Sequence, residues 1–105
     1  RTADATRNYS LAVKGLAEAA KADPTNSDTL YLLGNAYFSD NQRDKAIETY
    51  NKCLELNPRF AKARLNLGRT LVLKRDKAGA MVQYNELLKI DQKRAAQLKA
   101  DIDKL

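Results

Sequence analysis

The apolar and polar positions along the chain follow the period of amphipathic helices. Apolar residues recur every three or four positions in four segments, which are separated by short polar turns such as Asp40-Asn41-Gln42 and Lys74-Arg75-Asp76. This spacing places the apolar side chains on one face of a helix, where they can pack against a neighbour. The predicted helices lie near residues 27–39, 43–56, 61–74 and 77–90. The pattern therefore predicts an all-α fold of antiparallel helix hairpins.

The second hairpin repeats the first at a fixed interval of 34 residues. The recurring residues are Leu33 and Leu67, Gly34 and Gly68, Tyr50 and Tyr84, Pro24 and Pro58, and Ala12, Ala46 and Ala80. A fixed period of this length indicates a stacked repeat array, in which neighbouring units bury one continuous core. Proline ends each second helix because the residue before it is pushed out of the α region.

The order of residues within the unit resembles the tetratricopeptide repeat (TPR). The matching residues are Leu30-x-x-Leu33-Gly34-x-x-Tyr37, then Ala46-x-x-x-Tyr50, then Pro58. The next unit departs from this pattern at Arg64, Leu71 and Gln92. The resemblance covers roughly Ala12 to Asp91. It implies hairpins stacked in a right-handed superhelical array, and a binding scaffold rather than a catalyst.

This resemblance organises residues 1–105 as a single TPR domain. Its predicted parts are a partial repeat over 1–26, full repeats over 27–60 and 61–94, and a capping helix over 95–105. The partial repeat consists mainly of its second helix, Tyr9–Ala22, which follows a turn at Arg7-Asn8-Tyr9 and a first-helix stub at residues 1–6. Because the first residue is Arg1 rather than Met, we expect a segment of a longer protein.

The glycines inside the first helices predict close packing between helices. A helical glycine costs about 1 kcal/mol relative to alanine, and such a cost usually reflects the close approach of another element. We expect Gly34 and Gly68 to lie against the second helix of their own unit, near Ala46 and Ala80. At the end of the array, Ala95, Leu98, Ile102 and Leu105 form the apolar stripe of a capping helix that covers Leu87 and Leu88.

The helix at the beginning of the array lacks most of its partner. Leu11, Ala12, Leu16, Ala19 and Ala20 form its apolar stripe, while Val13 is expected to point away from that stripe. Some apolar surface is therefore predicted to be uncovered, and such surface usually marks a contact site. We expect this edge to contact a second copy of the chain, which makes a homo-oligomer a candidate assembly.

The residue types exclude most catalytic arrangements. The chain has no histidine, and its one cysteine, Cys53, occupies an apolar slot of the repeat that favours a buried structural thiol. Asp101 and Asp103 are two residues apart on a helix and therefore face different directions. We expect no enzyme activity, no cofactor and no metal site. The chain also shows no signal-peptide pattern or membrane-length apolar run; the compartment stays open, with the cytoplasm favoured.

The positive charge is concentrated in the second half of the chain. Residues 1–58 carry seven Lys/Arg against eight Asp/Glu, a net charge of −1, whereas residues 59–105 carry twelve against five, a net charge of +7. A solvated outer face explains this excess most simply. An acidic partner or an anionic membrane surface is the alternative.

In the TPR family the first helices of successive repeats line a concave groove that binds ligands. We transferred the family's groove positions to this chain by their place within the 34-residue repeat. The predicted groove residues are Asp28, Tyr31, Leu32, Asn35 and Phe38 in the first full repeat, and Lys62, Leu65, Asn66, Arg69 and Val72 in the second. Interleaved apolar and polar groups suit an extended peptide or a helix. Asparagine can bind a peptide backbone because its amide both donates and accepts.

One TPR subclass grips the C-terminal carboxylates of heat-shock chaperones with a lysine–asparagine clamp. Asn35, Lys62, Asn66 and Arg69 supply part of that chemistry. The clamp is incomplete, because Tyr31, Ala96 and Ala100 stand at positions where basic residues would be needed.

These observations predict a protein–protein interaction adaptor that binds a peptide or helix in the groove, with an acidic ligand as one candidate. Self-association into an oligomeric scaffold is the alternative. Nucleic acid is disfavoured because Tyr31, Leu32, Phe38 and Leu65 make the groove too apolar, and a membrane surface is disfavoured as well. The sequence leaves open the identity of the partner.

Overall fold

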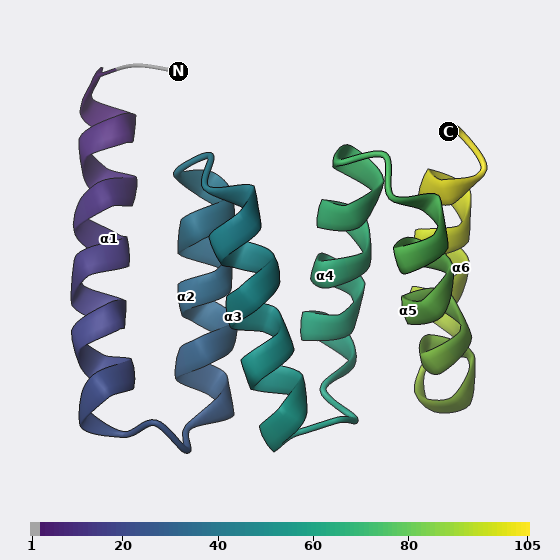
Figure 1. The fold of residues 1–105 in the computed structure, drawn as a ribbon, viewed down its shortest axis with the longest axis horizontal. Helices are drawn as coiled ribbons and strands as arrows, with labels where there is room; N and C mark the ends of the chain where they lie inside the picture. Colours follow the sequence, from purple (N-terminus) through teal and green to yellow (C-terminus); the bar gives the residue numbers. More distant parts are fainter. Residues whose placement is uncertain (1–2) are drawn as a thin grey trace. The chain divides into compact units, whose positions relative to one another are not determined.

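The structure is a computed structural model that describes residues 3–105, with side chains from residue 7 onward (Figure 1). Over these residues the chain is all-helical, as predicted. The helices are α1 (Ala3–Ala22), α2 (Ser27–Ser39), α3 (Arg43–Leu56), α4 (Ala61–Leu73), α5 (Lys77–Ile90) and α6 (Gln92–Ile102). The chain divides into two compact units, Arg1–Pro58 (unit 1) and Arg59–Leu105 (unit 2).

In unit 1, α2 packs against both α1 and α3. Its apolar residues at three- and four-residue spacing are buried, with Leu30 and Leu33 at 8% and 6% exposure. Asn26 caps α2, because its side-chain oxygen accepts a hydrogen bond from the Thr29 amide at 3.2 Å. The buried residues of α3 are Ala46, Thr49, Tyr50, Cys53 and Leu54.

Helix α1 differs from the prediction in two respects. The turn expected at Arg7-Asn8-Tyr9 is wrong, since the helix runs through these residues without a break. No glycine or proline interrupts the chain there. Val13 also faces the opposite way to the prediction: it is half-buried, whereas Leu11 is 55% exposed. Residues 1–2 of the predicted stub lie outside the described residues.

In unit 2, α6 packs against both α4 and α5. Ala95, Leu98 and Ile102 are fully buried there, as the predicted apolar stripe requires. They cover Leu87, which is also fully buried, but Leu88 and Leu105 stay 41% and 38% exposed. The C-terminal helix therefore covers the end of α5 only in part. The buried core of this unit is Leu65, Ala80, Leu87, Ala95, Leu98 and Ile102.

The two repeat glycines contact different partners. A Cβ atom placed on Gly34 would lie 2.5 Å from the Tyr50 ring, so this glycine packs on the second helix of its own hairpin. A Cβ on Gly68 would instead lie 2.5 Å from a methyl carbon of Leu98 on α6. The closest contact of Gly68 is therefore with α6, and not with the second helix of its own unit as predicted. A third helix is available in unit 2, and Leu98 fills the space beside the glycine.

The polar turns within the two hairpins share one backbone geometry. Asn41 and Arg75, 34 residues apart, both adopt the left-handed region, with φ of 63° and 60°. Asparagine tolerates this conformation better than arginine does. The repeat is thus preserved in the backbone even where the side chain changes.

Candidate ligand-binding faces

The five residues predicted for the groove on α2 lie on the side of the helix opposite its buried leucines. Asp28 is exposed, Leu32 is 50% exposed, and Tyr31, Asn35 and Phe38 are half-buried. Their three- and four-residue spacing keeps them on one face. This α2 face combines aromatic and aliphatic surface with a carboxylate and an amide.

Asn35 is held in place from below by the second helix. The Tyr50 hydroxyl donates a hydrogen bond to the Asn35 side-chain oxygen, and Tyr50 itself is only 1% exposed. A buried tyrosine needs a partner for its hydroxyl, because an unsatisfied buried polar group costs about 1–3 kcal/mol. The bond therefore fixes how the Asn35 amide is presented on the α2 face.

The corresponding face of α4 contains four of its five predicted residues. Lys62 and Arg69 are exposed, and Asn66 and Val72 are half-buried. Leu65 differs, because it is only 5% exposed and belongs to the buried core beneath α6. It presents little side chain to a ligand. The packing of α6 on α4 explains this difference, since that contact covers the line of the helix on which Leu65 lies.

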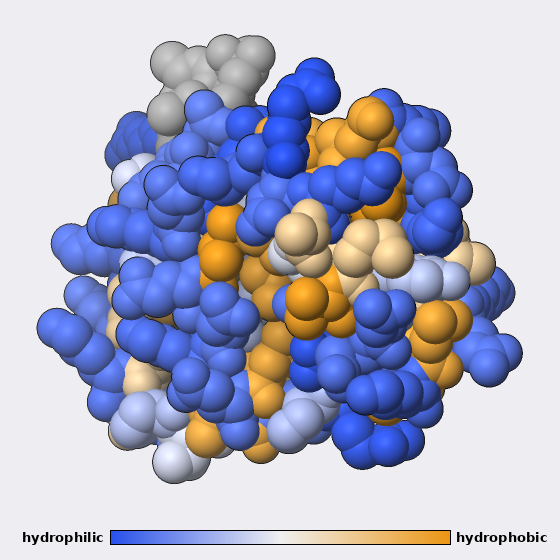
Figure 2. Space-filling view, turned by 45° about the vertical axis from the view of Figure 1, so that its right-hand side comes forward, coloured by the Kyte–Doolittle hydropathy of each residue, from blue (hydrophilic) through white to orange (hydrophobic). Residues whose placement is uncertain are grey.

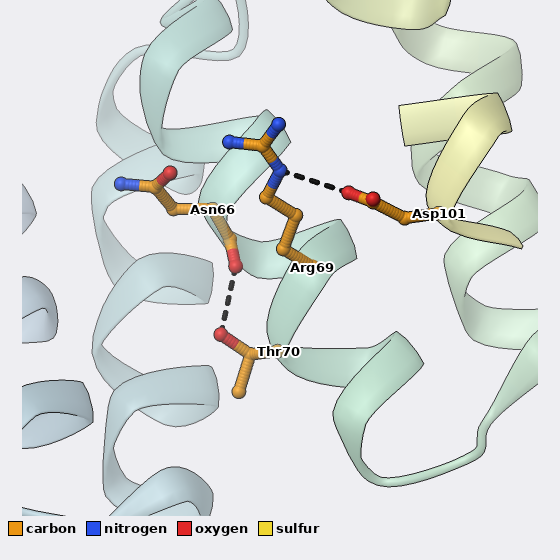
Figure 3. A network of polar contacts seen from close by, with 4 residues as sticks. All are labelled: Asn66, Arg69, Thr70 and Asp101. Atoms are coloured by element: carbon orange, nitrogen blue, oxygen red, sulfur yellow. Dashed lines mark hydrogen bonds and ion pairs between the residues drawn. The ribbon is translucent and has the colours of Figure 1, made fainter. Parts of the chain in front are cut away.

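Arg69 already has a carboxylate partner within unit 2. Its Nε atom lies 3.0 Å from an Asp101 oxygen on α6 (Figure 3). The two side chains are 45% and 32% exposed, so the pair contributes only about 0–1 kcal/mol to stability. An acidic ligand could therefore compete with Asp101 for Arg69. Next to it, the Thr70 hydroxyl donates to the Asn66 backbone oxygen at 2.7 Å.

Arg64 shows how unit 2 accommodates its departure from the repeat pattern. It stands where Leu30 stands in unit 1, and it is half-buried. One guanidinium nitrogen donates to the side-chain oxygen of Gln83 on α5 at 2.9 Å. The arginine thus joins α4 to α5 by a polar contact where unit 1 uses an apolar one.

Unit 1 also contains a cleft that the sequence reasoning missed. Its volume is about 710 Å³, and residues of α1, α2 and α3 line it, together with Pro24. The floor contains Leu30, Leu33 and Tyr37, which lie on the opposite side of α2 from the predicted groove residues. The sequence did contain one pattern among the residues that line this cleft. On α3, Lys45 and Lys52 are seven residues apart, and so are Glu48 and Glu55.

Cys53 has the properties of a structural thiol. It is fully buried, and its Sγ atom donates to the backbone oxygen of Ser27 at 3.2 Å. Burial, with a smaller contribution from the nearby Asp28 carboxylate, raises the pKa of the thiol to about 11. A thiol with this pKa is protonated at neutral pH and is therefore a poor nucleophile.

Two further properties of the described residues bear on function. Among them, no cluster of three or more Cys, Asp or Glu side chains is arranged to hold a metal ion. None of the helices in this part of the chain is both long and apolar enough to cross a membrane. The face drawn in Figure 2 is largely polar, with hydrophobic side chains exposed between the polar ones in places.

The sequence matches one family of repeats. Residues 27–60 and residues 49–96 each match a family model described as tetratricopeptide repeat. The chain is 36% identical over 67 residues to the photosystem I assembly protein Ycf3 of a Synechococcus species, covering 63% of this chain and 36% of that protein. It is 29% identical over 76 residues to the tetratricopeptide repeat and J domain-containing co-chaperone DNJ1 of Cryptococcus neoformans, covering 72% of this chain and 15% of that protein.

A third relative is an enzyme. The UDP-N-acetylglucosamine–peptide N-acetylglucosaminyltransferase of Giardia intestinalis is 36% identical over 58 residues, which make up 55% of this chain and 4% of that protein. The chain therefore spans only 4% to 36% of the length of these three relatives. The similarity therefore covers only a part of each of these proteins.

Proposed function

Because the chain belongs to the tetratricopeptide repeat family, whose repeats are protein–protein interaction modules, we propose that it is a non-catalytic adaptor that binds a peptide or helix along its first helices. Each of the two faces described above, α2 in unit 1 and α4 in unit 2, is proposed by itself as a ligand contact. The observation that carries the proposal is their composition: each face offers exposed or half-buried apolar groups beside polar ones. This mixture suits a protein segment. The names of two relatives, an assembly protein and a co-chaperone, agree with such a role.

The proposed ligand is acidic at the point where it meets α4. Lys62 and Arg69 are exposed there, and unit 2 carries the positive charge of the chain. A ligand carboxylate would form charge-assisted hydrogen bonds with these side chains. Leu32 and Phe38 on α2 would bury apolar side chains of the ligand. The buried hydroxyl of Tyr50 would keep Asn35 oriented for a backbone contact.

The proposal is tested by replacing Asp101, because its carboxylate competes with a ligand carboxylate for Arg69. Peptides selected for binding by phage display would be compared on three proteins: the parent, Asp101→Asn and Asp103→Asn. Both substitutions remove one negative charge from the end of α6. Asp101 pairs with Arg69, whereas Asp103 pairs with Lys99 at 2.6 Å.

We expect acidic peptides to bind Asp101→Asn several times more tightly than they bind Asp103→Asn. Equal affinities would exclude Arg69 from the site. A Leu32→Glu variant that retains full peptide binding would exclude the α2 face as well, and the adaptor proposal would then fail. Circular dichroism would verify that each variant keeps its helices.

Self-association through α1 is a second candidate function, and the repeat itself supplies the observation that favours it. Ala12 and Ala19 are exposed on α1, whereas Ala46 and Cys53, their equivalents in the next unit, are fully buried. Within the described residues, a Cβ on Gly15 would meet no atom within 4 Å. Together with the 55% exposed Leu11, these residues form a smooth helix face that suits a second helix.

Sedimentation at several concentrations would test the self-association. The parent should form dimers or larger species, and a Leu11→Glu variant should not. A parent chain that stays monomeric at high concentration would exclude this second candidate and leave the adaptor role unaffected.

A further inference from the structure

We propose that the end of the α4 face recognises two ligand side chains together, an acidic one and a large apolar one two positions away in an extended segment. This inference rests on the proposed function and adds the apolar residue to it. The acidic residue would bind Arg69. The apolar side chain would contact Leu73 on α4 and Leu105 just beyond α6, two exposed residues that we call the leucine pair.

The position of the leucine pair follows from the packing of α4 against α6 in unit 2. Both helices are antiparallel to α5, so they run in the same direction (Figure 1). The ion pair between Arg69 and Asp101 sets their register (Figure 3). Leu73 follows Arg69 by four residues. Leu105 likewise follows Asp101 by four residues, and its amide donates to the Ile102 oxygen at 3.0 Å, which continues the helical turn. Each leucine is therefore about one turn beyond the ion pair.

The leucine pair is exposed, unlike the leucines that form the core of the unit. Leu73 is 49% exposed and Leu105 is 38% exposed. By contrast, Leu65 and Leu98 of the same two helices are only 5% and 0% exposed. Residues four apart on a helix share a face, so Leu73 presents its side chain on the same side of α4 as Arg69. Apolar surface is thus available to a ligand next to the guanidinium group.

The distance along α4 sets the spacing of the two ligand residues. Arg69 and Leu73 are separated by four helical rises of about 1.5 Å, or about 6 Å along the helix axis. An extended chain advances about 3.3 Å per residue, and its side chains point alternately to opposite sides. Ligand residues two positions apart therefore point the same way and lie about 6.6 Å apart. Residues three positions apart point to opposite sides and do not fit. Either direction of the ligand along α4 satisfies this spacing.

The surroundings of the leucine pair favour acidic residues beside the apolar one. Three exposed basic residues lie at this end of unit 2, and within residues 7–105 none of their side chains is joined to a carboxylate: Arg75, Lys77 and Lys104. The nearby carboxylates already have contacts inside the unit. Asp76 accepts from the Gly79 amide at 2.9 Å, and Asp103 pairs with Lys99 at 2.6 Å. A ligand carboxylate would therefore meet basic side chains on both sides of the leucine pair.

Random peptides displayed on phage and selected on the full chain supply the probes. Synthetic, fluorescein-labelled copies would first be measured by fluorescence anisotropy on Asp101→Asn and Asp103→Asn. Peptides that bind Asp101→Asn more tightly use Arg69, and only these enter the comparison. We expect them to combine an acidic and a large apolar residue at a spacing of two more often than at three or four.

Three leucine variants then locate the apolar contact. Leu73→Ser and Leu105→Ser each alter the leucine pair, whereas Leu88→Ser alters a leucine of α5 that is 41% exposed and lies toward the opposite end of the unit. We expect Leu73→Ser to weaken the binding of the Arg69-dependent peptides by about fivefold, because the ligand would cover the exposed half of this side chain. Leu105→Ser should weaken it as well, and Leu88→Ser by less than about twofold.

The outcomes distinguish this inference from the proposed function. If no selected peptide uses Arg69, the proposed α4 contact fails and this inference fails with it. If such peptides exist but Leu73→Ser and Leu88→Ser bind them equally, the leucine pair is wrong and the acidic contact stands. An excess of peptides with a spacing of three or four would indicate a helical ligand and would overturn the extended motif. Circular dichroism spectra and urea titrations would show that each variant is folded.

Discussion

Single buried residues explain why the two repeats are similar in sequence but not identical in packing. In unit 1 the buried Tyr50 lies against Gly34 and donates its hydroxyl proton to Asn35. In unit 2 the equivalent Tyr84 is half-buried, and Leu98 of α6 lies against Gly68 instead. The repeat pattern predicted both glycines as close contacts. It could not predict the partner of Gly68, because that partner lies outside the repeated segment.

The two glycines should therefore respond differently to the same substitution. Gly34→Ala places a methyl group against a buried aromatic ring, which has little freedom to move. We expect a loss of about 1–3 kcal/mol in unfolding free energy, partly offset by the better helix propensity of alanine. Gly68→Ala should cost less, since the end of the Leu98 side chain can rotate. Urea titrations of both variants would measure the difference, and a larger loss for Gly68→Ala would contradict the packing described.

Cys53 should react with a thiol reagent only when the chain opens. Its raised pKa keeps the thiol protonated in the fold, and its burial excludes the reagent. Maleimide labelling at pH 7 should therefore be slow in the native protein and fast in urea. Because the folded pKa is higher than the ordinary 9.0, this residue should also make the fold less stable as the pH rises above 9. Rapid labelling without urea would show that the buried position is wrong.

At the scale of whole helices, amphipathic spacing predicted α2 to α5 well because their ends carry local signals. Polar turns and prolines mark these ends, and the structure places them within a residue or so of the prediction. Helix α1 was predicted less well, since among the described helices it packs against α2 alone and the pattern could not show which face meets α2. The cleft was missed because a single-helix pattern does not describe the space between helices. It depends on three helices, and the pattern of each helix records its own faces but not the space between them.

The start of α6 should make the stability of unit 2 depend on pH. Asp91 accepts a hydrogen bond from the Arg94 amide at 3.0 Å and pairs with the Arg94 guanidinium at 2.7 Å. These contacts, the backbone bond first, lower the pKa of Asp91 below the ordinary 3.8. A carboxylate with a lowered pKa contributes its full stability above the ordinary value and loses it as the pH falls through the folded value.

Replacement of Asp91 should remove this dependence. We expect the melting temperature of the parent to fall more steeply than that of Asp91→Asn as the pH drops below about 4, because asparagine can still cap the helix but does not titrate. Circular dichroism melts from pH 2 to 6 would measure both proteins. Parallel curves for the two would mean that Asp91 does not contribute through its charge.

For the molecule as a whole, the charge distribution follows the structural division. The boundary between the units at Pro58 and Arg59 is also the point where the net charge changes from −1 to +7. The proposed acidic contact through Arg69 thus lies in the basic unit, and the cleft lies in the unit with little net charge. A salt titration should weaken the binding of an acidic ligand at the α4 face, since exposed charge pairs are screened by salt.

The last helix should decide whether the chain stays soluble as a separate molecule. Truncation after Asp91 removes Leu98 and Ile102 and uncovers Leu65 and Leu87, all of which are almost fully buried. A contiguous apolar surface of this kind promotes association, so we expect the truncated chain to aggregate or form oligomers, beyond a simple loss of stability. Light scattering and thermal melts would compare it with a Lys104→Gln control of full length. If the truncated chain scatters and melts like that control, α6 does not act as a cap, and the apolar residues beneath it must be covered in some other way.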